Sequence, residues 1–215
     1  MKEAAKKTLD VLFERYPALE VCRADILAAA ETICACYRAG GKLLLCGNGG
    51  SAADAEHIVG ELMKGFLKKR PLPQATREKM KAAFPQDADY LYENLQGALP
   101  AVSLVNSVAL GTAFANDQAA DLVFAQQVLG LGREDDVLVA ISTSGNSKNV
   151  LYAAKVARVQ GLKTIALTGR SGGKLKPVAD ITIAVPSDET YCIQEYHLPV
   201  YHALCIAAET EFFDV

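Results

Sequence analysis

The sequence predicts an α/β fold, a three-layer αβα sandwich in which a five-stranded parallel sheet lies between helices. Three observations predict it. Five short apolar runs recur along the chain, and each is followed by a turn and a helical stretch. The runs are apolar throughout, as in strands that are covered on both faces. At 215 residues, 51% of them hydrophobic, the chain is long enough for a full core. The expected strands are 42–46, 101–105, 136–141, 163–168 and 181–185.

Two helices are expected before the first strand. Apolar residues recur with helical spacing over 2–16 and 19–38; Pro17 separates the two stretches, and Gly40 and Gly41 end the second. A polar, proline-bounded segment at about 70–100 interrupts the strand and helix rhythm. We expect a helical insertion there, and a lid or a surface loop remains an alternative. The whole chain, 1–215, is expected to form one domain.

Composition excludes several classes of function. The net charge of -3 gives no basic field for nucleic acid, and the basic stretch at 64–70 is short and local. No apolar run is long enough for a membrane span, and residues 1–10 lack the apolar middle of a signal peptide. The six cysteines lie mostly in apolar segments without a CxxC pair, which indicates buried thiols in a reducing compartment. A cytoplasmic protein is expected.

Two strand-to-helix turns have the composition of anion sites. After the first strand come Gly47, Asn48, Gly49, Gly50 and Ser51, and a turn of this kind directs backbone N–H groups and a hydroxyl toward the start of a helix. The third strand delivers a second loop with four hydroxyls in six residues, namely Ser142, Thr143, Ser144 and Ser147. Either loop alone is compatible with an ordinary solvated turn. Two at one edge of a parallel sheet favour a phosphate site.

A nucleotide is a weaker candidate for these loops. Gly47, Gly49 and Ala52 satisfy a loose G-x-G-x-x-A pattern, but the next strand ends in "SLVNS", without the acidic residue that would hold a ribose. The GxxxxGK[ST] loop is absent from the sequence. We therefore expect a sugar phosphate as the ligand and no nucleotide cofactor.

Four long segments together resemble the sugar-isomerase (SIS) domain family, and within it the phosphoheptose isomerases: "CGNGGSAADAEHIVGEL", "FANDQAADLVFAQQVLGLGREDDVLVAISTSGNSKNV", "TIALTGRSGGKL" and "IQEYHLPVYHAL". The resemblance covers nearly the whole chain and leaves out 72–99. It implies a homotetramer with active sites between subunits. It also implies interconversion of sedoheptulose 7-phosphate and D-glycero-D-manno-heptose 7-phosphate.

Moving a carbonyl between C1 and C2 of a sugar phosphate needs one base and one acid. Glu61 follows His57 by four residues and so shares its helix face, which makes Glu61 the candidate base. By the resemblance, Glu61 and His202 match the catalytic pair. The phosphate-binding positions match Ser51, Ser142, Thr143, Ser144 and Ser147, and further substrate-binding positions match Asn48, Gly49, Asp117 and Gln194.

The third functional role suggested by the resemblance is a zinc site. Some members of the family hold zinc with residues that match His57, Glu61, Gln194 and His202. His and Glu at i and i+4 form a sound half-site, whereas Gln194 and His202 are separated by about 12 Å of helix rise. On a regular helix His197 and His202 point in different directions, so only one of them is expected to face the site.

Two positions depart from the family pattern and leave the sugar open. Gly65 stands where an arginine is usual, with Lys64 beside it, and Tyr191 stands where an aspartate is usual. An isomerase of another pentose or hexose phosphate fits the same loops. A non-catalytic SIS scaffold that binds the replication initiator, or a sugar-phosphate sensor, is a further alternative. Because such scaffolds tend to lack the acid and base pair, Glu61 and His202 favour an enzyme.

Overall fold

A five-stranded sheet forms the centre of the computed structural model, which describes residues 1–213. The strand order is β2-β1-β3-β4-β5, and every neighbouring pair is parallel. The predicted α/β class is therefore confirmed. The strands are β1 (Leu43–Cys46), β2 (Ala101–Ser103), β3 (Val137–Ile141), β4 (Lys163–Thr168) and β5 (Ile181–Ala184).

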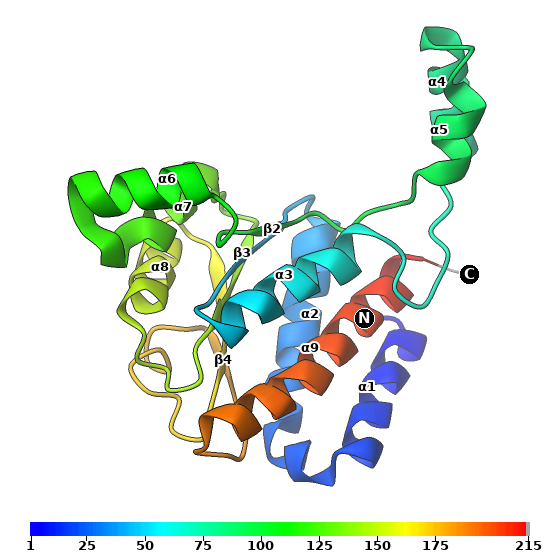
Figure 1. The fold of residues 1–215 in the computed structure, drawn as a ribbon. Helices are drawn as coiled ribbons and strands as arrows, with labels where there is room; N and C mark the ends of the chain where they lie inside the picture. The colour runs from blue at the N-terminus through cyan, green and yellow to red at the C-terminus, as the bar shows by residue number, and fades with distance from the viewer. Residues whose placement is uncertain (214–215) are drawn as a thin grey trace.

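Helices cover both faces of the sheet because alternate strand side chains point to opposite sides. In β1, Leu43 and Leu45 belong to one buried cluster, and Leu44 and Cys46 belong to the other. The first cluster lies under α2 (Arg23–Arg38), α3 (Gly50–Met63) and α9 (Thr190–Phe212). The second lies under α7 (Val123–Leu131) and α8 (Lys148–Val159). The two groups of helices stand on opposite sides of the strands in Figure 1, which gives the predicted three layers.

The two expected leading helices are present. Helix α1 (Glu3–Arg15) packs against α9, outside the layer that covers the sheet (Figure 1), and buries Leu9, Leu12 and Phe13. A 3₁₀ turn, η1 (Pro17–Cys22), leads into α2. The α-helix therefore begins at Arg23 rather than at residue 19, because the chain after Pro17 first makes the tighter turn.

Two segments lie on the outside of this core. Helices α4 (Gln74–Ala83) and α5 (Ala88–Asn94) occupy the segment at 70–100 and project from the body (Figure 1). After β2 come α6 (Val108–Phe114), the π turn η2 (Ala115–Ala119) and the 3₁₀ turn η3 (Ala120–Leu122). No residue of α4, α6 or η2 is buried. Within 1–213, no helix combines the length and the apolar character needed to cross a bilayer.

Helices α3 and α9 run side by side in the same direction, and their contact positions the site. At one end, Gly50 at the start of α3 lies against Gln194. At the other end, the chain just after α3 bonds Glu209 near the end of α9. We call this contact the α3–α9 seam. Helix α9 is continuous over 23 residues although it contains Pro199.

Candidate functional site

The first anion loop joins β1 to α3 through Gly47, Asn48 and Gly49. Gly49 has a φ of +56°, a conformation that glycine adopts without strain. The loop closes with short turns, in which Ser51 N donates to Asn48 O at 3.1 Å and Ala52 N donates to Gly49 O at 3.0 Å. Ser51 is buried in the first turn of α3, where the helix dipole attracts an anion.

The second anion loop joins β3 to α8 and holds its hydroxyls close together. The Oγ atoms of Ser142 and Ser147 are 3.0 Å apart, and Ser144 Oγ accepts a bond from Asn146 N at 3.2 Å. Gly145 has a φ of +65°, and a Cβ there would lie 2.1 Å from Gly172 O. The loop is thus wedged against the turn after β4, and any side chain at residue 145 would displace it.

Asn48 and Asn149 tie the two loops together. Asn48 Nδ2 donates to Asn149 Oδ1 at 2.9 Å, and Asn149 Nδ2 donates to Asn48 Oδ1 at 2.8 Å. Asn149 Oδ1 also accepts from Val150 N in the first turn of α8. This reciprocal amide pair fixes the spacing between the starts of α3 and α8. The sequence predicts Asn48 as a ligand residue, and no local pattern predicts the role of Asn149.

Glu61 and His57 meet on the α3–α9 seam. His57 Nε2 lies 3.2 Å from Glu61 Oε1, and Lys64 Nζ donates to Glu61 Oε2 at 3.2 Å. From α9, Tyr201 Oη lies 3.0 Å from His57 Nδ1 and donates to Asp54 Oδ1 at 3.3 Å. Burial raises the pKa of the Asp54 carboxyl, and burial together with the Asp54 charge raises the pKa of Tyr201. Neither Asp54 nor Tyr201 was identified from the sequence, although each lies within a motif segment.

His202 completes the cluster from α9. Its ring centroid is 5.0 Å from those of His57 and Tyr201 and 5.3 Å from that of Phe66. Burial and then the His57 charge lower the pKa of His202, while the Glu61 charge opposes them, so the neutral imidazole is favoured. His202 Nε2 is buried and has no hydrogen-bond partner among residues 1–213. The structure thus brings the predicted pair Glu61 and His202 into one cluster.

His197 points elsewhere, as the helix geometry requires. It is fully buried, and its Nε2 lies 3.3 Å from Thr168 O at the end of β4. Burial lowers the pKa of His197 to about 4. A neutral ring that donates to a strand carbonyl holds α9 to the sheet and is not available to the site.

Of the four residues of the expected zinc site, His57, Glu61 and His202 lie in one cluster and Gln194 lies apart from them. Gln194 faces the start of α3, because a Cβ on Gly50 would lie 2.4 Å from Gln194 Nε2. Gly50 precedes His57 by about 10 Å of helix rise. In the part of the chain that the structure describes, no three His, Cys, Asp or Glu side chains form a group that could hold a metal ion. In these positions the four side chains do not form a zinc site.

Asp117 also lies apart from this cluster. It is exposed on η2 and bonds its neighbour Asn116, whose Nδ2 donates to Asp117 Oδ1 at 2.8 Å. It lines a surface depression of about 550 Å³ with residues of α6 and α7, including Phe114 and Gln126. Residues 1–213 of one chain place Asp117 beside neither Glu61 nor the serine loops.

A buried ion pair fixes the end of α3 that carries Glu61. The side chains of Arg70 and Glu209 are both fully buried, with Arg70 Nε 2.9 Å from Glu209 Oε1. The Arg70 guanidinium also donates to the carbonyls of Glu61 and Leu62. Burial would raise the pKa of Glu209, but bonds from Phe66 N, Leu67 N and Arg70 outweigh it and hold the pKa below its ordinary value. The sequence places Arg70 in a short basic stretch that would be expected on the surface, whereas the structure buries it.

The structure accounts for the glycine at residue 65. A Cβ on Gly65 would lie 2.5 Å from Lys68 O, and Gly65 N donates to Gln96 Oε1 at 2.7 Å. An arginine at this position would clash with the tight turn. Lys64 supplies the cation next to Glu61 instead, from three residues away. Tyr191, the second departure, is exposed at the start of α9.

The parallel sheet and its two anion loops define a class, and the comparison agrees: the chain belongs to the SIS domain family, whose model matches residues 17–94 and 91–169. Among curated relatives, it is 37% identical to the phosphoheptose isomerase of Akkermansia muciniphila over 99% of each chain. It is 40% identical to that of Helicobacter pylori strain P12, over 98% of this chain and 91% of the relative.

A solved structure gives the same result. The phosphoheptose isomerase of Neisseria gonorrhoeae is 35% identical, with a TM-score of 0.73, over 96% of this chain and 97% of that one. The resemblance to phosphoheptose isomerases that the motifs indicated is thereby confirmed.

Proposed function

We propose that this protein is a phosphoheptose isomerase that interconverts sedoheptulose 7-phosphate and D-glycero-D-manno-heptose 7-phosphate. One observation carries the proposal. Glu61, His57 and His202 meet on one seam, in a chain that is similar to phosphoheptose isomerases over nearly its whole length. The substrate is a small phosphorylated sugar.

The chemistry assigns a role to each of the two catalytic candidates. The Glu61 carboxylate removes the proton from the carbon next to the carbonyl, and the electron pair passes to the carbonyl oxygen as an enediolate. The neutral His202 imidazole, with its unpartnered Nε2, donates a hydrogen bond to that oxygen and assists proton return. Lys64 adds a positive charge beside Glu61.

The two anion loops hold the phosphate in this proposal. The dipoles of α3 and α8 and the hydroxyls favour an anion at the loops, which the Asn48 and Asn149 pair holds in register. Gln194, beside Gly50, is close enough to the first loop to contact the substrate. The proposed phosphate ligands are Asn48, Gly49, Ser51, Ser142, Thr143, Ser144 and Ser147.

We also propose that the protein acts as a homotetramer in the cytoplasm. Large apolar side chains are exposed on α1 (Val11), on the η1 turn (Val21) and on α6 (Val108, Leu110), and such surfaces mark interfaces. Asp117 reaches a substrate only if another subunit brings it there. The six unpaired cysteines suit a reducing compartment. Sedimentation velocity at micromolar concentration measures the assembly, and a monomer would contradict it.

The decisive experiment follows proton exchange in heavy water. The wild-type protein should wash deuterium into C1 or C2 of sedoheptulose 7-phosphate. Glu61→Gln keeps the shape of the side chain and removes the base, so turnover should fall by roughly 100- to 10,000-fold with KM little changed. Glu56→Gln, on the exposed face of the same helix, is the matched control and should turn over normally.

Four other outcomes would change the assignment. Normal turnover by Glu61→Gln would exclude Glu61 as the base. Turnover of a five- or six-carbon ketose phosphate in preference to the heptulose phosphate would change the assigned substrate and leave the proposed mechanism intact. If no sugar phosphate is turned over, with or without a chelator, the result would favour a non-catalytic scaffold or a sugar-phosphate sensor. Loss of wild-type activity on addition of a chelator alone would support a bound metal ion, although the positions of the four side chains do not form a zinc site.

A further inference from the structure

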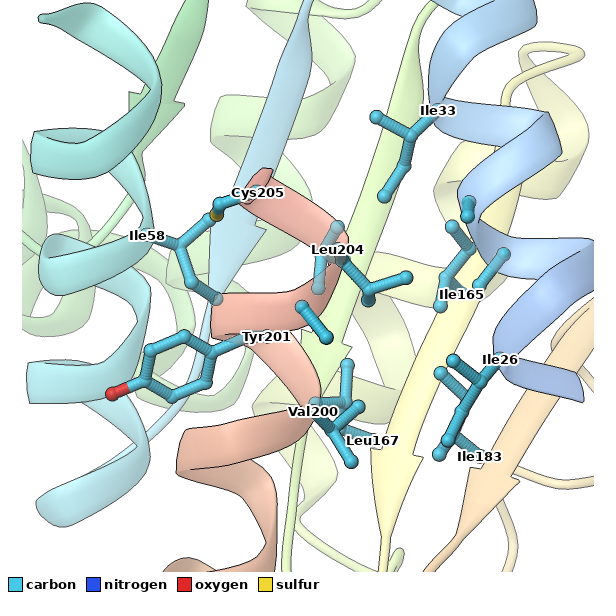
Figure 2. Close-up of a cluster of buried hydrophobic side chains, with 14 of the residues drawn as sticks. Ile26, Ile33, Ile58, Ile165, Leu167, Ile183, Val200, Tyr201, Leu204 and Cys205 are labelled. Atoms are coloured by element: carbon cyan, nitrogen blue, oxygen red, sulfur yellow. The ribbon is translucent and has the colours of Figure 1, made fainter. Parts of the chain in front are cut away.

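The middle of the α3–α9 seam is filled by apolar side chains. Ile58 of α3 points toward Tyr201 and Cys205 of α9 in Figure 2, and all three belong to the same buried cluster. Burial of apolar surface stabilises the contact between the two helices, but it has no direction. Apolar packing therefore does not by itself fix how far α3 lies along α9, and polar contacts are needed to set that position.

Arg70 holds the last turn of α3 at its carbonyl groups. The helix ends at Met63, and the last four carbonyls of a helix have no partners within it. Arg70 Nη2 donates to Glu61 O at 3.0 Å, and Arg70 Nη1 donates to Leu62 O at 2.6 Å. The positive guanidinium also complements the negative end of the helix dipole. The backbone that carries the proposed base is thus bonded directly to a buried side chain.

The same guanidinium is anchored to α9. Arg70 Nε donates to Glu209 Oε1 at 2.9 Å, and Arg70 Cζ lies 4.8 Å from the centre of the Phe213 ring. Both side chains of the ion pair are fully buried. Glu209 Oε2 in turn accepts from Leu67 N at 2.8 Å and from Lys68 N at 3.1 Å. Because the guanidinium is a rigid planar fork, it cannot shift without losing one of these partners.

The anchor on α9 lies in line with the proposed acid. Glu209 follows His202 by seven residues, which is two helical turns and nearly the same face. The ion pair therefore joins the turn that carries Glu61 to the helix that carries His202. We propose that Arg70 and Glu209 are positioning residues, which set the distance between Glu61 and His202. The catalytic consequence rests on the proposed function, in which these two side chains exchange protons with one substrate.

Stability alone does not require a buried ion pair at this place. Replacing such a pair by apolar side chains of similar volume is often neutral or stabilising, because the cost of desolvating two charges offsets their attraction. Apolar side chains cannot supply a fork that meets one carboxylate and two carbonyls at fixed distances. Proton transfer depends on that geometry, since a displacement of about 1 Å can lower the rate roughly 100-fold.

A double variant without either charge separates position from stability. Arg70→Met removes the fork and fills most of its volume, and Glu209→Gln keeps an acceptor for the N–H groups of the loop after α3. No unpaired charge remains in the core, so the urea midpoint should stay near that of the wild type. With sedoheptulose 7-phosphate, kcat should fall about 10- to 100-fold, and KM should change little because the anion loops are untouched. A wild-type kcat in the folded double variant would overturn the proposal.

Arg70→Lys gives the same test if the double variant does not fold. The ammonium keeps the charge opposite Glu209, but it is a point charge and does not reproduce the fork toward Glu61 O and Leu62 O. Its kcat should fall in the same direction with KM little changed. A folded Arg70→Lys protein with wild-type kcat would contradict the positioning role.

The matched control is an ion pair at the opposite end of the sheet. Lys42, just before β1, donates through Nζ to the buried carboxylate of Asp136. Lys42→Met combined with Asp136→Asn removes this pair by the same chemistry, far from the seam. The control should keep the wild-type kcat, whatever its urea midpoint. An equal fall in kcat in the control would show that the loss of any such pair has this effect, and the proposal would be wrong.

Hydrogen exchange tests the contact without turnover. In the double variant, the amides of residues 58–64 should exchange faster than in the wild type, while those of β3 and β4 should be unchanged. If the wild type turns over no sugar phosphate and this difference appears, the ion pair holds the turn and the proposed function fails. If the wild type is active and the double variant changes neither exchange nor kcat, the function stands and the positioning role fails.

Discussion

The anion loops and the α3–α9 seam are built by opposite means. Within each loop, neighbouring residues fix the geometry, as in the Ser142 and Ser147 pair and the turn at Gly49. In the seam, the contacts join residues far apart in sequence: His57 meets Tyr201 across 144 positions, and Phe66 meets Glu209 across 143. The shape of each loop is encoded mainly by neighbouring residues, although the two loops are joined by the distant pair Asn48 and Asn149. The seam exists only once the chain has folded.

This difference separates binding from stability. The loops lie at the sheet edge, with Ser144 exposed and Thr143 and Ser147 half-buried, so these three hydroxyls can reach a ligand. The seam contains the buried Arg70 and Glu209 pair, whose loss would leave an unpaired charge in the core. Substitutions in the loops should therefore affect substrate affinity, and substitutions in the buried Arg70 and Glu209 pair should affect the fold.

The largest effect is expected from the second loop. Replacing Ser144 and Ser147 together with alanine should raise KM strongly, because each hydrogen bond to a charged phosphate is worth about 1.5 to 3 kcal/mol. The melting temperature should fall only slightly, since the substitution removes two side-chain bonds, Ser142 to Ser147 and Asn146 to Ser144, and the backbone bonds of the loop remain. Ser171→Ala, in the exposed neighbouring turn, is the control for the loss of a hydroxyl. An unchanged KM would show that this loop does not bind the substrate phosphate.

The same contrast explains what the sequence could predict. Strand positions and both serine loops follow from apolar runs and turn residues, which are local signals. The divergence of His197 and His202 follows from helix geometry alone. Arg70, Tyr201 and Asn149 could not be assigned, because their partners lie on other elements. Gln194 shows a different limit: the family resemblance grouped it with His57, and in this chain its side chain lies against Gly50.

A smaller but still severe effect is expected from the seam. Glu209→Ala leaves Arg70 buried without its partner and three loop N–H groups without an acceptor, at Phe66, Leu67 and Lys68. Breaking a buried pair in this way costs about 3 to 5 kcal/mol. Urea unfolding followed by circular dichroism measures it.

The control for this substitution lies on the same helix. Glu195→Ala, at an exposed position of α9, should change the unfolding free energy by less than about 0.5 kcal/mol. If Glu209→Ala lowered the unfolding free energy no more than Glu195→Ala, the buried pair would not stabilise the seam. The proposed contrast between the seam and the loops would then be wrong.

The smallest effect depends on pH and sharpens the contrast within α9. His197 has a folded-state pKa of about 4, below the ordinary value of 6.5, because burial disfavours its charged form. Between these two values the unfolded chain binds the additional proton, so the stability that His197 contributes is complete above pH 6.5 and is lost as the pH falls toward 4. At 1.36 kcal/mol per pKa unit, the loss of stability reaches about 3 kcal/mol.

Urea unfolding of the wild type and of His197→Gln at pH 7.5, 6 and 5 measures this effect. Because carboxylates and His202 titrate over part of the same range, the informative quantity is the difference in unfolding free energy between the two proteins. The variant should be less stable at pH 7.5 and should lose less stability on acidification. If the unfolding free energies of the two proteins changed with pH in parallel, burial would not hold His197 neutral. Its bond to Thr168 would then not be what joins α9 to the sheet.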